Sequence, residues 1–227
     1  THDLAAAAAD IDLAVVVVPT EANRGLLAQL APMIPKQAAV VSATKGIEQG
    51  THKLISQIFE DAFEESERHR LTYLGGPSFA KEVAQGMPTA VCVAGHDEAV
   101  TERVQAYFNT DRFRVYTTDD VIGVEVGGAL KNVVAIAAGI ADGMGMGHNT
   151  RAALITRGLA ELSRLALKLG AHPLTLAGLS GLGDLVLTCS SESSRNFSLG
   201  KGLGEGQSPE ALLSDRRTGA EGALTAP

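Results

Sequence analysis

The sequence predicts an α/β unit built on a parallel sheet, followed by an all-α unit. Apolar, β-branched runs alternate with helical patterns over residues 1–118. Such alternation is typical of parallel strands joined by right-handed crossovers. Residues 119–227 carry helical patterns without a convincing strand.

The first half alternates strand and helix signals. The run Ile11–Pro19 is continuously apolar and β-branched, which is typical of a strand buried on both faces. Further strands are expected at Ala38–Thr44, Leu71–Gly76, Thr89–Gly95 and Phe113–Thr118. Helices are expected between them at Glu21–Ile34, His52–Ser66 and Asp97–Asn109, with a short one from Ser78.

The second half is predicted to contain helices separated by turn-rich segments. They are expected at Asp120–Gly139, Arg151–Gly170, Pro173–Gly178 and Leu182–Ser190. This order suggests a nucleotide-binding domain, residues 1–118, docked on a helical substrate and catalytic domain, residues 119–227. Active clefts favour such junctions.

Composition and charge argue against several classes of protein. The 227 residues carry a net charge of -7, which disfavours a nucleic-acid partner or an anionic membrane surface. No apolar run in the sequence is expected to span a bilayer. Two distant cysteines, Cys92 and Cys189, suit a reducing cytoplasm better than a disulfide framework. The histidines show no metal-ligand spacing, so no metal site is predicted.

Two glycine-rich segments, Gly143–His148 and Gly178–Asp184, resemble dinucleotide fingerprints. A fingerprint follows a buried strand and opens a helix, so that a pyrophosphate meets the helix N-terminus. Both segments lie among predicted helices instead. We therefore do not expect either to bind a pyrophosphate.

Lys131 lies in the apolar segment Gly123–Gly139, which holds only two other polar side chains. A buried ammonium is costly unless something pairs with it or uses it. On a helix its neighbours Gly127 and Gly128 cost about 1 kcal/mol each relative to alanine, and they would clear a groove beside the lysine. The alternative is a lysine that reaches the surface or pairs with a buried carboxylate.

Two loops follow predicted strands of the first half. Lys45 stands just past a strand, at the edge where open α/β sheets bind ligands; the alternative is a solvated loop lysine. Gly75 and Gly76 permit close backbone approach after the next strand, and free amides near Ser78 would suit an anion. Ser78 could equally serve only to cap the following helix.

Asp184 and the segment Ser193–Asn196 are the candidate polar groups of the second half. Asp184 stands among apolar residues and is a natural partner for a cation, or else the N-cap of the helix that follows. The segment Ser193–Asn196 ends a polar turn before another possible helix. Its hydroxyl, guanidinium and amide, beside free helix amides, predict a phosphate-binding site.

Taken in this order, the motifs resemble the NAD(P)-dependent glycerol-3-phosphate dehydrogenases of the bacterial type. The resemblance covers most of Ile11 to Gly200. The segments that carry it are SATKGIE, GGPSFAKEVAQGMPTA, FRVYTTDDVIGVEVGGALKNVVAIAAGIADGMGMGHNTRAALITRGLAE, LAGLSGLGDLVLTC and SRN, with AEGALTA near the end.

The resemblance implies a Rossmann-type parallel sheet, whose first βαβ unit is missing from this chain, and a truncated all-α substrate domain. It implies a cytoplasmic enzyme that reversibly reduces dihydroxyacetone phosphate to glycerol 3-phosphate. NAD or NADP would be the cofactor, and the product would supply phospholipid synthesis. Lys131 would be the proton donor or acceptor, with Asn132 beside it. Substrate contacts would be Lys45, Gly76, Ser78, Lys131, Asp184, Ser194, Arg195 and Asn196. Cofactor contacts would be Lys45, Ala80, Arg195 and Glu221.

If Lys131 is the acid–base group, its pKa should be shifted by its surroundings. Burial and the nearby cation of Lys45 would lower that pKa, whereas Asp184 would oppose the shift. A protonated Lys131 would stabilise the charge that develops on the ketone oxygen and deliver the proton.

The sequence departs from the family at several points. The first strand and its fingerprint are absent, as is a helical region beyond Pro227, so we expect a piece of a longer protein. Phe197 and Ser198 stand where the family often has further arginine, and Gly219 replaces an aliphatic residue. The stretch Ala135–Ala141 consists largely of small residues, on which a second copy could pack to form a homodimer.

Two alternatives stay open. A 3-hydroxyacid dehydrogenase of the 6-phosphogluconate type also uses a helix lysine, but its partner asparagine falls four residues later. Here Asn132 is adjacent and position 135 is Ala135, which favours the first reading. The second alternative is a non-catalytic domain or an inactive truncated product, since the chain lacks a pyrophosphate site and would leave a sheet edge exposed.

Overall fold

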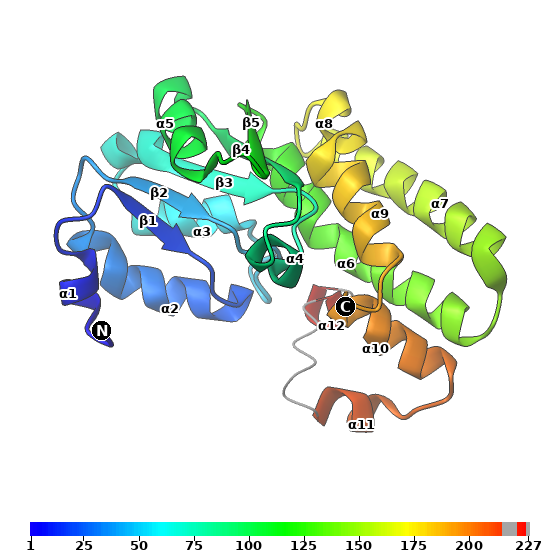
Figure 1. Ribbon diagram of the computed structural model, residues 1–227. Helices are drawn as coiled ribbons and strands as arrows, with labels where there is room; N and C mark the ends of the chain where they lie inside the picture. The colour runs from blue at the N-terminus through cyan, green and yellow to red at the C-terminus, as the bar shows by residue number, and fades with distance from the viewer. Residues whose placement is uncertain (215–221, 226–227) are drawn as a thin grey trace.

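A computed structural model describes residues 1–214 and 222–225 and places a sheet-containing part beside a helical part (Figure 1). The sheet has five strands that lie in chain order. These strands are β1 (Leu13–Val16), β2 (Ala39–Ser42), β3 (Leu71–Gly75), β4 (Thr89–Gly95) and β5 (Phe113–Thr118). In the register of the central pair, Val41 of β2 lies opposite Thr72 of β3.

The pairing of β3 with β4 is antiparallel, whereas the other three pairings are parallel. The sequence predicted a mainly parallel sheet and did not predict this reversal. The connection between the two strands contains only the five-residue helix α4 (Ala80–Ala84). Such a helix rises only about 7.5 Å, too little to carry the chain back along the sheet for a parallel return. Strand β4 therefore runs in the opposite direction.

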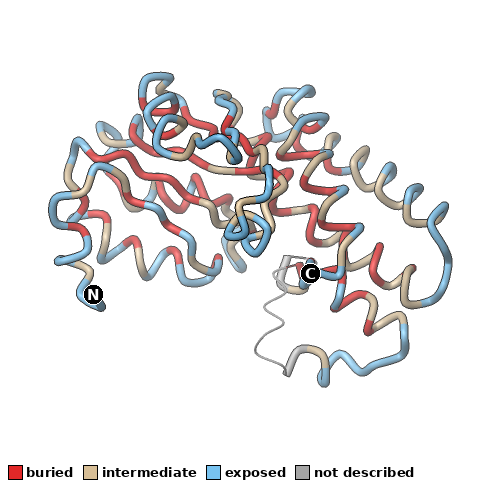
Figure 2. The backbone as a smooth tube through the Cα atoms, viewed as in Figure 1, coloured by how far each residue is buried: buried red, intermediate tan, exposed pale blue. Residues whose placement is uncertain are grey.

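Both faces of the central strands are buried, as Figure 2 shows. Neighbouring residues of a strand point to opposite faces, so Val40 and Val41 of β2 belong to different apolar clusters. The first cluster includes residues of α2 (Thr20–Leu30) and α3 (Ile55–Ala62), and the second those of α5 (Glu98–Phe108). The other short elements of this part are α1 (Leu4–Ala8), η1 (Ala31–Met33) and η2 (Glu65–Arg70).

The edge strand β1 differs from the prediction. Ile11–Pro19 was expected to be buried on both faces, but the strand spans only Leu13–Val16. Val15 is 51% exposed and Val17 beyond the strand is 64% exposed. The reason is its position at the edge of the sheet, where the described residues cover only one of its faces fully.

The helical part is organised around α6 (Val121–Gly143), which packs on most of its neighbours (Figure 1). No strand occurs among its described residues. The remaining elements are α7 (Gly147–Lys168), α8 (Pro173–Ala177), the π-helical turn η3 (Leu179–Gly183), α9 (Asp184–Cys189), α10 (Arg195–Gly204), α11 (Pro209–Ser214) and α12 (Gly222–Thr225).

Helix α6 is long and apolar enough to cross a membrane by length and composition. The sequence analysis expected no apolar run long enough to span a bilayer, and that expectation was wrong for α6. However, 61% of its apolar window is buried inside the protein. It is capped at its start by Asp120, whose Oδ1 accepts a hydrogen bond of 2.8 Å from the amide of Gly123. These contacts make α6 the core helix of this part.

Helices α6 and α10 run parallel and approach closely through glycines. A Cβ at Gly200 would lie 2.1 Å from the carbonyl oxygen of Ile136, and one at Gly204 would lie 2.3 Å from that of Ile140. This register brings the N-terminus of α10 beside Asn132, next to Lys131. Gly139 thus contacts α10, and Ala135 and Ala138 lie in an apolar cluster with residues of α7, α9 and α10, so these small residues pack within the chain.

Substituting Gly200 tests this close packing. Gly200→Ala should lower the free energy of unfolding by about 1–3 kcal/mol, because the new methyl group forces the helices apart. The matched control is Gly25→Ala on α2, where a Cβ meets no atom within 4 Å. That change should raise stability by roughly 0.5–1 kcal/mol. Guanidinium unfolding followed by circular dichroism measures both, and equal effects would contradict the packing described.

Candidate active site

The ends of β2 and β3 bring two chain segments to the same edge of the sheet. These strands are parallel, so their carboxyl ends share the edge that faces the helical part (Figure 1). Lys45 follows β2 after two residues, and Gly76 follows β3 directly. The Nζ of Lys45 donates a hydrogen bond of 3.1 Å to the carbonyl oxygen of Gly76.

Asp184 joins this edge to α6. Its Oδ2 accepts a hydrogen bond of 2.8 Å from Lys45 Nζ, and its Oδ1 accepts one of 2.5 Å from Lys131 Nζ. Asp184 is only 1% exposed and Lys131 only 7% exposed. Asp184 is the first residue of α9 and caps nothing with its side chain. Of the two interpretations of Asp184, the cation partner is therefore correct.

Thr188 completes the surroundings of Lys131 and was missed by the sequence analysis. Its Oγ1 accepts a hydrogen bond of 3.0 Å from Lys131 Nζ and donates one of 2.6 Å to the carbonyl oxygen of Asp184. It is buried one helical turn after Asp184. The four-residue spacing from a candidate aspartate was the available signal, because residues i and i+4 share a helix face.

The pKa of Lys131 is lowered to about 8. Burial is the largest cause, because it disfavours the charged form, and the ammonium of Lys45 lowers the pKa further. The carboxylate of Asp184 raises it and opposes both effects. The predicted direction of the shift, and the predicted sign of each contribution, are confirmed.

The two glycines before Lys131 have different roles. A Cβ at Gly127 would lie 2.5 Å from the carbonyl oxygen of Ser180, so this glycine lets η3 approach α6. A Cβ at Gly128 would lie 3.4 Å from Cγ of Lys45, so this glycine leaves space for the Lys45 side chain. The groove expected beside Lys131 is thus filled by η3 and Lys45.

Gly76 and Ser78 lie beside Lys45. Gly76 has φ +122°, a conformation that favours glycine, and its carbonyl oxygen also accepts a hydrogen bond of 3.2 Å from Ser78 Oγ. Ser78 was considered as a helix cap, but α4 begins at Ala80 and its N-cap residue, Phe79, makes no side-chain cap bond. The hydroxyl of Ser78 instead faces back toward the lysine.

The segment Ser194–Asn196 does start a helix, as predicted. Ser194 caps α10, since its Oγ accepts a hydrogen bond of 3.2 Å from the amide of Phe197. Asn196 is buried, and its Oδ1 accepts one of 2.9 Å from the amide of Gly222. Arg195 is exposed. The parallel packing of α10 on α6 places this helix start beside Asn132.

The remaining candidates are placed as follows. Ala80 is exposed at the first position of α4, two residues beyond Ser78. Glu221, and the departure at Gly219, lie outside the described residues. Within residues 1–214 and 222–225, no group of three or more metal-ligating side chains occurs. The glycine-rich segment Gly143–His148 joins α6 to α7, between helices as expected.

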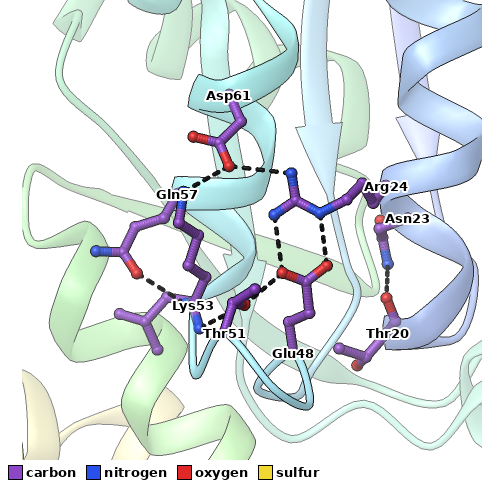
Figure 3. Close-up of polar contacts among 9 residues, drawn as sticks. Thr20, Asn23, Arg24, Glu48, Thr51, Lys53, Gln57 and Asp61 are labelled. Atoms are coloured by element: carbon purple, nitrogen blue, oxygen red, sulfur yellow. Dashed lines mark hydrogen bonds and ion pairs between the residues drawn. The ribbon is translucent and has the colours of Figure 1, made fainter.

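The loop that carries Lys45 is held on its outer side by charged groups (Figure 3). Arg24 of α2 donates two hydrogen bonds of 2.8 Å to the two carboxylate oxygens of Glu48, and a third of 3.1 Å to Asp61. Lys53 donates one of 2.6 Å to Asp61. The loop is therefore tied to both α2 and α3.

The fold, the buried Lys131 and the partly buried Lys45 describe an α/β protein with an acid–base site at the edge of its sheet. Two family models match the chain, the NAD-dependent glycerol-3-phosphate dehydrogenase N-terminus over residues 1–101 and its C-terminus over residues 120–227. The chain belongs to this family, and the predicted Rossmann-type fold is confirmed.

Curated relatives and solved structures support the same family assignment. The glycerol-3-phosphate dehydrogenase [NAD(P)+] of Citrifermentans bemidjiense is 52% identical over 225 residues, 99% of this chain and 67% of the relative. That of Myxococcus xanthus is 50% identical over 226 residues, 100% of this chain and 68% of the relative. A crystal structure of the Coxiella burnetii glycerol-3-phosphate dehydrogenase superposes with TM-score 0.90 at 38% identity, covering 98% of this chain and 67% of that one. The structure of the Saccharomyces cerevisiae glycerol-3-phosphate dehydrogenase superposes with TM-score 0.84 at 27% identity, covering 99% of this chain and 67% of that one.

Removing the shared carboxylate tests the electrostatics of the site. Asp184→Asn should lower the pKa of Lys131 below its value of about 8, by about 1–3 units, because an opposing charge is lost. NMR titration of 13Cε-labelled lysine measures this pKa directly. Asp142→Asn is the matched control, since Asp142 pairs with Arg151 and should leave Lys131 unaffected. An unchanged or higher pKa in Asp184→Asn would contradict the arrangement.

Proposed function

We propose that the protein catalyses the reversible reduction of dihydroxyacetone phosphate to glycerol 3-phosphate with NADH or NADPH, and so supplies glycerophospholipid synthesis. The relatives at about half identity carry this activity in their names. The observation that carries the proposal is the buried Lys131, whose pKa of about 8 suits proton transfer near neutral pH.

Lys131 is the acid–base group in this proposal. When bound, the nicotinamide supplies a hydride to the carbonyl carbon, and negative charge develops on the carbonyl oxygen. The protonated Lys131 stabilises that charge by a hydrogen bond and then delivers its proton to the oxygen. In the oxidative direction Lys131 must be neutral to accept the proton. A pKa close to the working pH makes both states accessible.

The remaining substrate contacts divide between the two parts of the protein. Lys45 and Ser78 converge on the carbonyl of Gly76, where the polar end of a small substrate would be held against Lys131. At the other end, the start of α10 offers backbone amides and the exposed Arg195 to the phosphate, with Ser194 and Asn196 as the residues that shape this turn. Binding of the phosphate there orients the ketone.

The cofactor would be held where the sheet edge meets the helices. Lys45, Ala80, Arg195 and Glu221 are the proposed contacts. The fit is supported by the exposed positions of Ala80 and Arg195 and by the carboxyl ends of β2 and β3, the edge at which nucleotides bind in open α/β sheets. We propose that either NAD or NADP is used.

The other parts of the proposal follow from the same arrangement. We assign residues 1–118 to the dinucleotide-binding domain and 119–227 to the substrate domain. The buried packing of α6 supports a protein without membrane insertion, and the two free, buried cysteines suit a reducing cytoplasm. A homodimer would use a surface other than Ala135–Ala141. The family matches favour this activity over a 6-phosphogluconate-type 3-hydroxyacid dehydrogenase or a non-catalytic domain.

The first test removes the proposed acid. Lys131→Met in the full-length protein should lower kcat for reduction of dihydroxyacetone phosphate by roughly 10²–10⁴-fold, the usual contribution of general acid–base catalysis. Lys168→Met, at the exposed end of α7, is the matched control and should retain activity. Steady-state oxidation of NADH measures both. Near wild-type turnover in Lys131→Met would remove this lysine from the mechanism.

The second test is the pH dependence. Reduction requires protonated Lys131, so its kcat/KM should fall as pH rises through about 8. Oxidation of glycerol 3-phosphate requires the neutral amine, so its kcat/KM should rise through the same range. Measuring both directions between pH 6 and pH 10 checks the prediction. Parallel profiles in the two directions would be incompatible with one group that serves as both acid and base.

A further inference from the structure

Glu125 on α6 lies six residues, nearly two helical turns, before Lys131 and takes no part in the site described so far. It is partly buried. Its Oε1 accepts a hydrogen bond of 2.7 Å from the amide of Ser56, and its Oε2 accepts one of 2.5 Å from Ser56 Oγ. Ser56 is the second residue of α3, so a side chain of the helical part binds the start of a helix in the sheet-containing part.

Ser56 stands at the far end of the loop that carries Lys45. This loop leaves β2 after Ser42 and ends where α3 begins at Ile55. Its own structure includes a bridge between Ile47 and Leu54. Glu125 therefore fixes the end of the Lys45 loop to the same helix that carries Lys131.

Three positions of α6 connect the two ends of this arrangement. Glu125, Gly128 and Lys131 follow one another at intervals of three residues, which places them along one ridge of the helix. The Lys45 side chain lies over Gly128 and meets Lys131 at the carboxylate of Asp184. The loop thus contacts α6 at successive turns, first through Ser56 and then through Lys45.

Apolar packing holds the distal part of the loop, where Ile47 and Leu54 lie in a cluster with Val126 and Leu130 of α6, but it does not reach the Lys45 side chain. A small cavity, with space for about one water molecule and both polar and apolar lining residues, lies between the loop, α6 and β3. Its lining residues include Ser42, Thr44, Lys45, Tyr73, Glu125 and Gly128. The apolar contacts and the hydrogen bonds at the rim of the cavity therefore act together on the loop, and the ammonium of Lys45 itself is held by hydrogen bonds.

The outer ion pairs are weaker restraints. The side chain of Arg24 is 45% exposed and that of Asp61 is 35% exposed. Exposed ion pairs are screened by water and salt, although the bidentate pair of Arg24 with Glu48, whose side chain is 13% exposed, still restrains the outer side of the loop. The Glu125–Ser56 contact is more enclosed, and burial raises the pKa of Glu125 to about 7 while Ser56 opposes that rise.

We propose that Glu125 is a positioning residue, which sets the ammonium of Lys45 against Asp184 and thereby controls the charge environment of Lys131. Its catalytic consequence rests on the proposed function, but its effect on Lys131 does not. The action is exerted through contact geometry. A glutamine can accept from the amide of Ser56 and donate its amide hydrogen to Ser56 Oγ, so it preserves both contacts without the charge.

The test compares Glu125→Ala with Glu125→Gln in the full-length protein. In Glu125→Ala the loop loses its hydrogen-bonded anchor at Ser56, so Lys45 moves away from Asp184 and Asp184 pairs more closely with Lys131. The pKa of Lys131, measured by NMR of 13Cε-labelled lysine, should then rise above about 8. The kcat/KM for dihydroxyacetone phosphate should fall about 10- to 100-fold, the scale of a small misplacement. Glu125→Gln should stay within about threefold of the wild type, with an unchanged Lys131 pKa.

The outcomes separate the two proposals. If the wild type does not reduce dihydroxyacetone phosphate but the Lys131 pKa responds as expected, the proposed function fails and the positioning role stands. An unchanged Lys131 pKa in Glu125→Ala overturns the positioning role whatever the activity. Loss in Glu125→Gln equal to that in Glu125→Ala also overturns it, because contact geometry would then not be the cause. Should Glu125→Ala fail to fold, Ser56→Ala, which removes one of the two bonds, must give a smaller rise in the same pKa.

Discussion

The carboxylate of Asp184, shared by two lysines from different parts of the chain, is the interaction on which the site depends. Burying charge is costly unless it is paired, and here one buried carboxylate serves both ammonium groups. The balance still leaves one positive charge. A site with this imbalance favours either an anionic ligand or the loss of one proton. Reduction of a phosphorylated ketone uses both properties, since its substrate is anionic and a proton leaves the site.

Bringing three charged groups together requires the chain to approach itself closely. Gly127 admits the backbone of η3, which leads directly into Asp184, and Gly128 leaves space for Lys45. Larger side chains would push the carboxylate and one ammonium away from α6. Two adjacent glycines lower the intrinsic helix propensity of α6, and the close approach of η3 and of Lys45 explains why glycine occupies both positions.

The order of elements and the central residues could be predicted from the sequence, because they depend on local patterns. Lys131 and Asp184 were identifiable since each is a charge in an otherwise apolar segment. The antiparallel β4 could not be predicted, because periodicity gives no strand direction. Ser78 was ambiguous for a similar reason, as capping and ligand positions share one residue type. Glu125 was visible as a polar residue of α6, but its partner Ser56 lies 69 residues away, and only tertiary structure joins them.

Because Asp184 is shared, the position of the Lys45 loop affects the pKa of Lys131. In a site with one buried lysine, a shift of a neighbouring loop would change the pKa only through the burial of the amine. Here any movement of Lys45 alters two interactions of Lys131 at once, since it weakens a repulsion and frees Asp184 for a stronger attraction. Both changes raise the pKa of Lys131, so they add rather than cancel. A pKa near neutrality can therefore persist only if the Lys45 loop is held in place, which makes the anchoring of that loop part of the acid–base chemistry.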